Sequence, residues 1–228
     1  MPRETFAQEL SRLDDELLSL ASMVDTALEG SVEALKRRDL ESARQLMADD
    51  QWINEKRFAV EDAALVLIAT QQPVASDLRT IAAVLEIATE LERIGDYAKG
   101  IAKVVLLMGS EPLAKPLVDI PEMAERARHM LRQAVDAFVR RDVELARAIP
   151  RQDDVVDALY NRVYRDLMDL IVHDVGAMDQ ANHLLWVAHN LERTADRTIN
   201  ICERVVFTVT GVMREMDVGD GEGIERTN

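Results

Sequence analysis

Pairs of oxygen-bearing side chains spaced four residues apart are the feature of this sequence best suited to chemistry. Glu92 and Asp96 form one pair, and Glu192 and Asp196 repeat it 100 residues later. Residues four apart in an α-helix lie on the same face, so each pair places two carboxylates side by side. Both pairs lie about 130–180° from the apolar stripe of their own helix. We therefore expect these acids to point away from the core.

A second set of pairs lies on the preceding long helical stretch of each half. Asp50 and Asn54 are four residues apart, and so are Asp153 and Asp157. In both copies the first member lies about 70° and the second about 110° from the apolar stripe, in the same rotational sense. If the two helices are antiparallel neighbours, the pairs meet on one outward surface. This predicts a first cluster (Asp50, Asn54, Glu92 and Asp96) and a second cluster (Asp153, Asp157, Glu192 and Asp196).

Carboxylates gathered in this way favour a bound cation. Each charge raises the cost of ionising its neighbours, and a hard cation removes that cost. Oxygen ligands suit Mg²⁺, Ca²⁺, Mn²⁺ or iron better than a thiolate-rich zinc site. Two plainer interpretations stay open: the acids are a solvated helix face, or Arg93 and Arg193 neutralise them through salt bridges. The four histidines form no Glu-x-x-His pair of the kind found in di-iron carboxylate bundles.

Internal repeats indicate which elements position these pairs. Two blocks recur in the same order, about 100 residues apart, so one structural unit occurs twice. The aligned blocks are ALKRRDLESAR at 34–44 with AFVRRDVELAR at 137–147, and LERIGDYAKGIA at 91–102 with LERTADRTINIC at 191–202. Only 9 Gly and 6 Pro interrupt a chain rich in Ala, Leu, Glu and Arg, which favours long helices. We predict helices at about 4–36, 40–70, 73–108, 120–140, 142–174 and 178–213, with Asp39 and Asp142 as N-caps.

Three long helices per repeat, joined by short turns, predict an all-α fold. The expected architecture is two tandem antiparallel three-helix bundles related by a pseudo-twofold axis. The first repeat covers residues 1–110 and the second covers 119–213, with a proline-containing linker between them. The acidic, glycine-rich segment 214–228 is expected to be a disordered tail.

Composition excludes several classes of protein. The chain has 27 Lys and Arg against 42 Asp and Glu, a net charge of -15, which repels nucleic acid and anionic lipid. A single cysteine, Cys202, cannot form an internal disulfide. The longest apolar run, at 63–69, is far shorter than the ~20 residues that span a bilayer. We expect a soluble cytoplasmic protein that binds no nucleic acid and does not insert into the membrane.

The same residues carry a resemblance to a known family. LERIGDYA and LERTADRT resemble the doubled E(D)xxxD motif of PhoU-type proteins, the accessory regulators of phosphate-specific transport. TQQPVASDLR at 70–79 resembles a further family segment at the start of the third helix, and the RRDLESAR and RRDVELAR turns also fit. The similarity extends over about residues 5–212 and includes the two-repeat plan.

The resemblance implies a site, partners and a role. Metal would bind at both clusters as multinuclear centres, iron foremost, with Mn, Mg or Zn as alternatives; Asn54 stands where the full pattern has Asp. The protein would form a homodimer and bind the ATPase subunit of the phosphate ABC transporter and a sensor histidine kinase, peripherally at the inner membrane face. It would regulate the phosphate-starvation response negatively.

Three functions remain in competition at this stage. A regulatory adaptor needs no catalytic group, and the sequence contains no Ser/His/Asp set, Gly-rich phosphate loop or Cys-x-x-Cys motif. A metal-dependent helical-bundle enzyme, either an oxidase or a hydrolase, would need its ligands in a sheltered cavity, against the outward placement predicted here. The third alternative is a metal-free helical scaffold. We favour the adaptor and expect no enzymatic activity.

Overall fold

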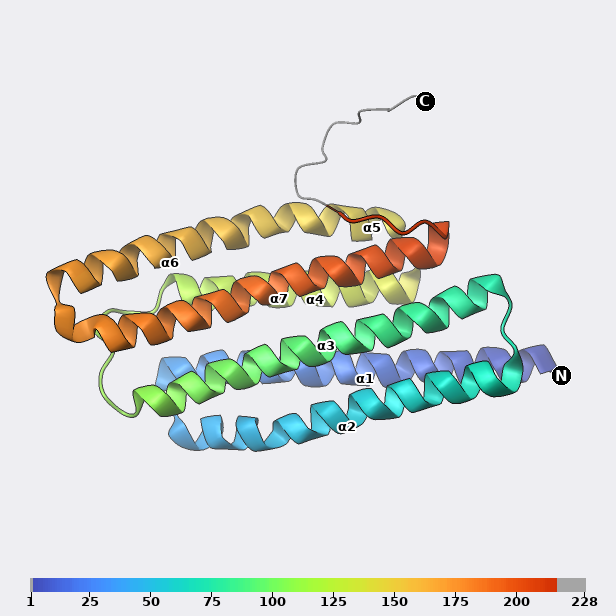
Figure 1. Cartoon of the computed structure of the whole chain (residues 1–228), viewed down its shortest axis with the longest axis horizontal. Helices are drawn as coiled ribbons and strands as arrows, with labels where there is room; N and C mark the ends of the chain where they lie inside the picture. Colours follow the sequence, from blue (N-terminus) through green and yellow to red (C-terminus); the bar gives the residue numbers. More distant parts are fainter. Residues whose placement is uncertain (1, 217–228) are drawn as a thin grey trace, which may run out of the picture.

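A computed structural model describes residues 2–216 of the chain, which form helices joined by turns, with no strand among them (Figure 1). The all-α prediction is confirmed. Short 3-10 helices, η1 (Ile149–Gln152) and η2 (Val175–Ala177), join α5 to α6 and α6 to α7. The α-helices are α1 (Pro2–Arg37), α2 (Leu40–Gln71), α3 (Ala75–Met108), α4 (Asp119–Arg140), α5 (Val143–Ala148), α6 (Asp153–His173) and α7 (Met178–Thr210).

The repeated Arg-Arg-Asp sequence ends one helix and begins the next in both halves. Arg38 and Arg141 adopt the left-handed backbone conformation, with φ of 58° and 54°. Asp39 then accepts hydrogen bonds from two backbone N–H groups of α2, and Asp142 accepts one from α5 at 3.0 Å. These bonds satisfy N–H groups that have no partner inside the helix. Both predicted N-caps are therefore confirmed.

The prediction of one continuous helix over 142–174 is wrong. Pro150 lies inside that stretch, and proline removes a backbone donor and clashes with the carbonyl four residues earlier. The chain accordingly passes through η1 between α5 and α6. As a result Asp153 is the first residue of α6, whereas its counterpart Asp50 lies within the uninterrupted α2.

The two repeats lie side by side as two bundles (Figure 1). Helices α1, α2 and α3 pack together, as do α4, α6 and α7 with the short α5. Between the bundles, α3 packs along α7 and α1 packs on α4, whereas α2 and α6 lie on the outer sides. A continuous apolar core of buried Leu, Ile, Val, Ala and Met side chains fills both bundles. Each cluster therefore lies on a pair of helices belonging to its own bundle.

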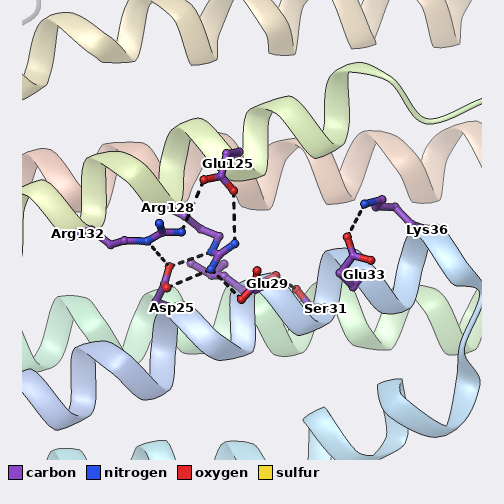
Figure 2. Close-up of polar contacts among 9 residues, drawn as sticks. Asp25, Glu29, Ser31, Glu33, Lys36, Glu125, Arg128 and Arg132 are labelled. Atoms are coloured by element: carbon purple, nitrogen blue, oxygen red, sulfur yellow. Dashed lines mark hydrogen bonds and ion pairs between the residues drawn. The ribbon is translucent and has the colours of Figure 1, made fainter.

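Charged side chains cross the interface between α1 and α4, as Figure 2 shows. Arg128 of α4 donates to both oxygens of Asp25 on α1, at 2.9 and 3.1 Å, and its side chain is only 8 % exposed. Glu29 lies 3.0 Å from the same guanidinium, and Arg132 lies 3.3 Å from Asp25. This network joins the two bundles through polar contacts as well as through the core.

A second polar network joins α3 to α7. Arg197 of α7 lies 3.3 Å from Glu90 of α3, and Asn200 donates to the same carboxylate at 3.1 Å. The hydroxyl of Tyr97 accepts hydrogen bonds from Arg193 and Arg197, at 3.0 and 3.2 Å. Arg193, which the sequence offered as a neutralising partner of the second cluster, is therefore partly engaged at the interface between the bundles.

The segment predicted as a disordered tail begins within the described residues. The backbone N–H of Met216 donates to Glu203 of α7 at 2.8 Å, so residues up to 216 follow the bundle. The rest of that segment, from residue 217 onward, lies outside the described residues. Among the helices of residues 2–216, none combines the length and apolar character required to cross a bilayer.

Candidate metal centres

The first cluster lies along the contact between α2 and α3. Asp50 is 5 % exposed and Asn54 is half-buried on α2, while Glu92 is half-buried and Asp96 exposed on α3. Gly95 allows the close approach of the two helices, because a Cβ there would lie 3.1 Å from a side-chain atom of α2. The α2 and α3 pairs therefore lie on two helices that pack closely together.

A lysine lies inside the first cluster. Lys99, also on α3, donates to Asp50 Oδ2 at 2.7 Å. Asn54 Nδ2 donates to the same oxygen at 3.0 Å. Burial, and after it the negative charge of Asp50, raises the pKa of Asp96, and Lys99 opposes that rise. The cluster thus holds a positive charge supplied by the chain itself.

Glu92 is also subject to opposing charges. Burial, followed by the charge of Asp96, raises the pKa of Glu92, while Arg57 of α2 lowers it. An open groove of about 450 Å³ borders this cluster, with Asp50, Lys99 and Trp52 among its lining residues. The first cluster is therefore a partly compensated set of charges at the edge of a largely apolar groove.

The second cluster has the same plan but different compensation. Asp153 is 4 % exposed, and its Oδ1 has no hydrogen-bond partner within residues 2–216. Burial, and after it the charges of Asp157, Asp196 and Glu192, raises the pKa of Asp153 to about 7. Ile199 stands where the first repeat has Lys99. No lysine therefore enters this cluster from the equivalent position.

The positive charges that act on the second cluster belong to His189, Arg193 and Arg197 of α7. Burial and the charge of Asp196 raise the pKa of Glu192, whereas His189 lowers it. The Nδ1 atom of His189 lies 3.2 Å from Glu192 Oε2, which is an ion pair only when the ring is protonated. Arg193 and Arg197 lower the pKa of Asp196, although burial outweighs them. These charges offset part of the repulsion among the four acids.

The two clusters differ in how well they fit a metal ion. Asp153 offers a buried oxygen without a partner, and its cluster has four carboxylates, the donors that hard cations prefer. In the first cluster, two N–H donors already occupy Asp50 Oδ2. Within the described residues, no group of three or more His, Cys, Asp or Glu side chains stands in an arrangement that could hold a metal ion. Metal binding would therefore require the acidic side chains to rotate toward a common point. In the second cluster, Asp153 Oδ1 has no hydrogen bond to lose in such a rotation.

The outward placement of the acids is only partly correct. Asp96, Asp157 and Asp196 are exposed, but Asp50 and Asp153 are buried. These two residues lie closest to the apolar stripes of their helices, where α2 packs on α3 and α6 packs on α7. Their burial is the reason that unpaired charge is costly in each cluster.

Sequence reasoning missed Lys99. Its signal was available, because Lys99 lies three residues after Asp96 and seven after Glu92, which places all three on one helix face. The ion pairs between the bundles were also missed. Those contacts join residues about 100 positions apart, so no local spacing reveals them.

Comparison with known proteins gives the family. The PhoU domain model matches residues 17–105 and 120–205. A phosphate-specific transport system accessory protein PhoU homolog of Clostridium acetobutylicum is 34% identical over 221 residues, covering 96% of this chain and 100% of the relative. The PhoU accessory protein of Escherichia coli is 32% identical over 206 residues, covering 90% of this chain and 86% of the relative.

Solved structures agree with this assignment. The crystal structure of the phosphate transport system regulatory protein PhoU from Streptococcus pneumoniae has a TM-score of 0.86 to this chain at 30% identity, covering 92% of this chain and 99% of that one. PhoU from Pseudomonas aeruginosa also has a TM-score of 0.86, at 29% identity, covering 91% and 100%. Both repeats and nearly the whole length are included, and the chain therefore belongs to the PhoU family.

Proposed function

We propose that this protein is a regulator of phosphate uptake that acts through binding rather than catalysis. The observation that carries this proposal is the match of both repeats, over nearly the whole chain, to accessory and regulatory proteins of phosphate transport. In this proposal the protein dampens the phosphate-starvation response. It does so at the cytoplasmic face of the membrane, by coupling the ATPase subunit of the phosphate ABC transporter to a sensor histidine kinase, and it acts as a homodimer.

A deletion and a pull-down test the regulatory role. Deletion of the gene should raise expression of phosphate-starvation genes in phosphate-replete cells, and the intact chain should restore repression. The tagged protein should recover the ATPase subunit and the kinase from the same cells. Unchanged expression in the deletion strain together with recovery of neither partner would refute the proposal. Light scattering of the purified chain tests the homodimer.

Metal binding is the second part of the proposal. The second cluster would hold a hard cation, with iron foremost and Mn, Mg or Zn as alternatives, through Asp153, Asp157, Glu192 and Asp196. What supports this is the free, buried oxygen of Asp153 among three further carboxylates. A bound cation would neutralise the repulsion among these acids. The predicted binding at Asp50, Asn54, Glu92 and Asp96 is not part of this proposal, because Lys99 already pairs with Asp50 there.

Elemental analysis of chelator-free protein tests metal binding directly. Asp153→Asn keeps the shape of the side chain and removes its charge, so it should weaken binding at the second cluster by tenfold or more. Asp154→Asn changes the exposed neighbour on the same helix and should have a much smaller effect. Equal metal content in both variants would contradict a site built around Asp153.

A metal-dependent enzyme has one observation in its favour. The groove of about 450 Å³ beside Asp50 would offer a substrate some space. Asp50, the cluster acid that lines this groove, is paired with Lys99, however, and the acids of the two clusters that have an unpartnered oxygen lie in the other bundle. Metal-dependent turnover that is lost on Glu192→Ala would favour the enzyme over the adaptor.

A further inference from the structure

The two clusters differ at one aligned position of α3 and α7. In the first repeat this position is Lys99, whose ammonium group lies 2.7 Å from Asp50 Oδ2. In the second repeat it is Ile199, which has an apolar, buried side chain. The repeats align here without a gap, since LERIGDYAKGIA and LERTADRTINIC have equal length. The fold is thus the same while the charge in the cluster is different.

A second substitution acts in the same direction. Arg57, which lowers the pKa of Glu92 in the first cluster, is replaced by Tyr160 at the equivalent position of α6. The first cluster also has Asn54 in place of a fourth carboxylate, as Asp157 provides in the second. The first cluster therefore has fewer negative charges and more positive ones. All three differences reduce the repulsion among its acids, and so they reduce the stabilisation that a bound cation would give.

We propose that Lys99 is the built-in cation of the first cluster, so that binding of divalent cations is confined to the second cluster. The ammonium group occupies the oxygen of Asp50 that a metal ion would need, and it supplies the charge that a metal ion would bring. Two positive charges a few ångströms apart repel strongly in a half-buried site. This inference rests on the metal-binding part of the proposed function, and it makes the two family motifs unequal in this chain.

Burial distinguishes this pair from an ordinary surface ion pair. Lys99 is 40% exposed along its side chain, but Asp50 is 5% exposed and receives the ammonium group and the Asn54 amide on one oxygen. A buried carboxylate needs a charge partner in order to stay ionised. Lys99 meets that need from the adjacent helix. Removing Lys99 should therefore leave the buried Asp50 carboxylate without its charged partner, with only the Asn54 amide donating to Oδ2.

Titration of metal-free protein with MnCl₂ tests the inference. The full-length chain, cleared of metal with a chelator, is titrated by calorimetry, and the bound manganese is counted by elemental analysis. The wild type should show one binding event, which Asp153→Asn removes. Lys99→Met, which keeps the apolar stem, should add a second event at the first cluster, at least tenfold tighter than the wild type shows there. Lys103→Met changes an exposed lysine one turn further on and should add nothing.

A double variant assigns the new event to its cluster. Lys99→Met combined with Asp153→Asn should retain the gained event and lose the original one. Thermal melts provide an independent readout, because Lys99→Met should lower the melting temperature of the metal-free protein and Mn²⁺ should restore it. If Lys99→Met unfolds the chain, Lys99→Gln serves in its place, since its amide can still donate to Asp50 while bringing no charge.

The outcomes separate this inference from the rest of the proposed function. A Lys99 variant that folds but gains no manganese site overturns the inference, even if the second cluster binds metal. The inference is also overturned if the wild type binds manganese at the first cluster, as revealed by binding that survives Asp153→Asn and is lost on Asp50→Asn. If the wild type binds none and Lys99→Met creates a site, the role of Lys99 as the built-in cation of the first cluster is supported, and metal binding at the second cluster is refuted.

Discussion

Removal of Arg128 should loosen the contact between the two bundles by a measurable amount. Its guanidinium makes two hydrogen bonds to Asp25, at 2.9 and 3.1 Å, and lies 3.0 Å from Glu29 and 3.5 Å from Glu125. Breaking a fully buried ion pair costs about 3–5 kcal/mol. Asp25 is 23% exposed and keeps Arg132 at 3.3 Å, which lowers the expected cost. We expect Arg128→Met to reduce the free energy of unfolding by about 2–3 kcal/mol.

A double-mutant cycle isolates the pair itself. Asp25→Asn should cost only about 1 kcal/mol, because Glu29 and Glu125 still neutralise Arg128. The double variant should be less destabilised than the sum of the two single variants, by about 1–2 kcal/mol. Urea denaturation followed by helical circular dichroism gives each value, provided that a second probe shows the same transition.

A neighbouring arginine provides the matched control. Arg132 is 47% exposed and lies on the same helix, so Arg132→Met should cost no more than about 1 kcal/mol. Equal losses for Arg128→Met and Arg132→Met would refute the reasoning, and so would a coupling energy close to zero for Asp25 with Arg128. Either result would mean that the ion pair of Asp25 with Arg128 adds little to the stability of the contact between the bundles.

Three further predictions concern single side chains. Burial raises the pKa of Asp14 to about 6 from its ordinary 3.8, so between these values the folded state retains a proton that the unfolded state releases. The free energy of unfolding should therefore fall as the pH rises from about 4 to about 6. Urea denaturation at several pH values should show this slope in the difference between wild type and Asp14→Asn. Burial raises the pKa of Cys202 to about 12, so a thiol reagent at pH 8 should label it only as fast as the protein opens, and labelling at the rate of a free thiol would contradict its burial. Asp39→Ala removes the cap of α2 and should lower the free energy of unfolding by about 1 kcal/mol, with Asp39→Asn retaining most of the stability in the same denaturation assay.

The helices and the pairing of acids could be predicted because both depend on local spacing. The N-caps at Asp39 and Asp142 follow from a repeated tripeptide, and the meeting of α2 with α3 follows from a short antiparallel turn. The break at Pro150 was also visible in the sequence, but the apolar pattern continues through it and suggests an unbroken helix.

The burial of Asp50 and Asp153 could not be predicted from helical angles alone. An angle of about 70° from the apolar stripe is compatible with either solvent or a neighbouring helix. The depth of each residue depends on how closely the helices approach, and at the first cluster Gly95 permits that approach. The counterpart of Gly95 is Ala195, so the second pair of helices reaches the same degree of burial with a methyl group at this position.

The network between the bundles has a regularity that only the repeats reveal. Asp25 and Arg128 are 103 residues apart, and Tyr97 and Arg197 are 100 apart, the offsets that relate the two copies of their segments. Each pair thus consists of equivalent positions that meet across the pseudo-twofold axis. In two identical repeats such positions would place an acid against an acid or a base against a base. Complementary residues at these positions therefore require the repeats to differ.

The same divergence has a different effect away from the axis. There, equivalent positions do not meet, so a change in one repeat alters one cluster and leaves the other untouched. Lys99 and Ile199 are such a pair: Lys99 contacts Asp50 of its own bundle, whereas Ile199 is buried and brings no charge to the acids. Differences at the axis thus make the contacts between the two bundles complementary. Differences away from the axis give the two clusters different charges on the same backbone arrangement. A chain of this kind can keep its fold while the acids of one cluster have more compensating positive charge than those of the other.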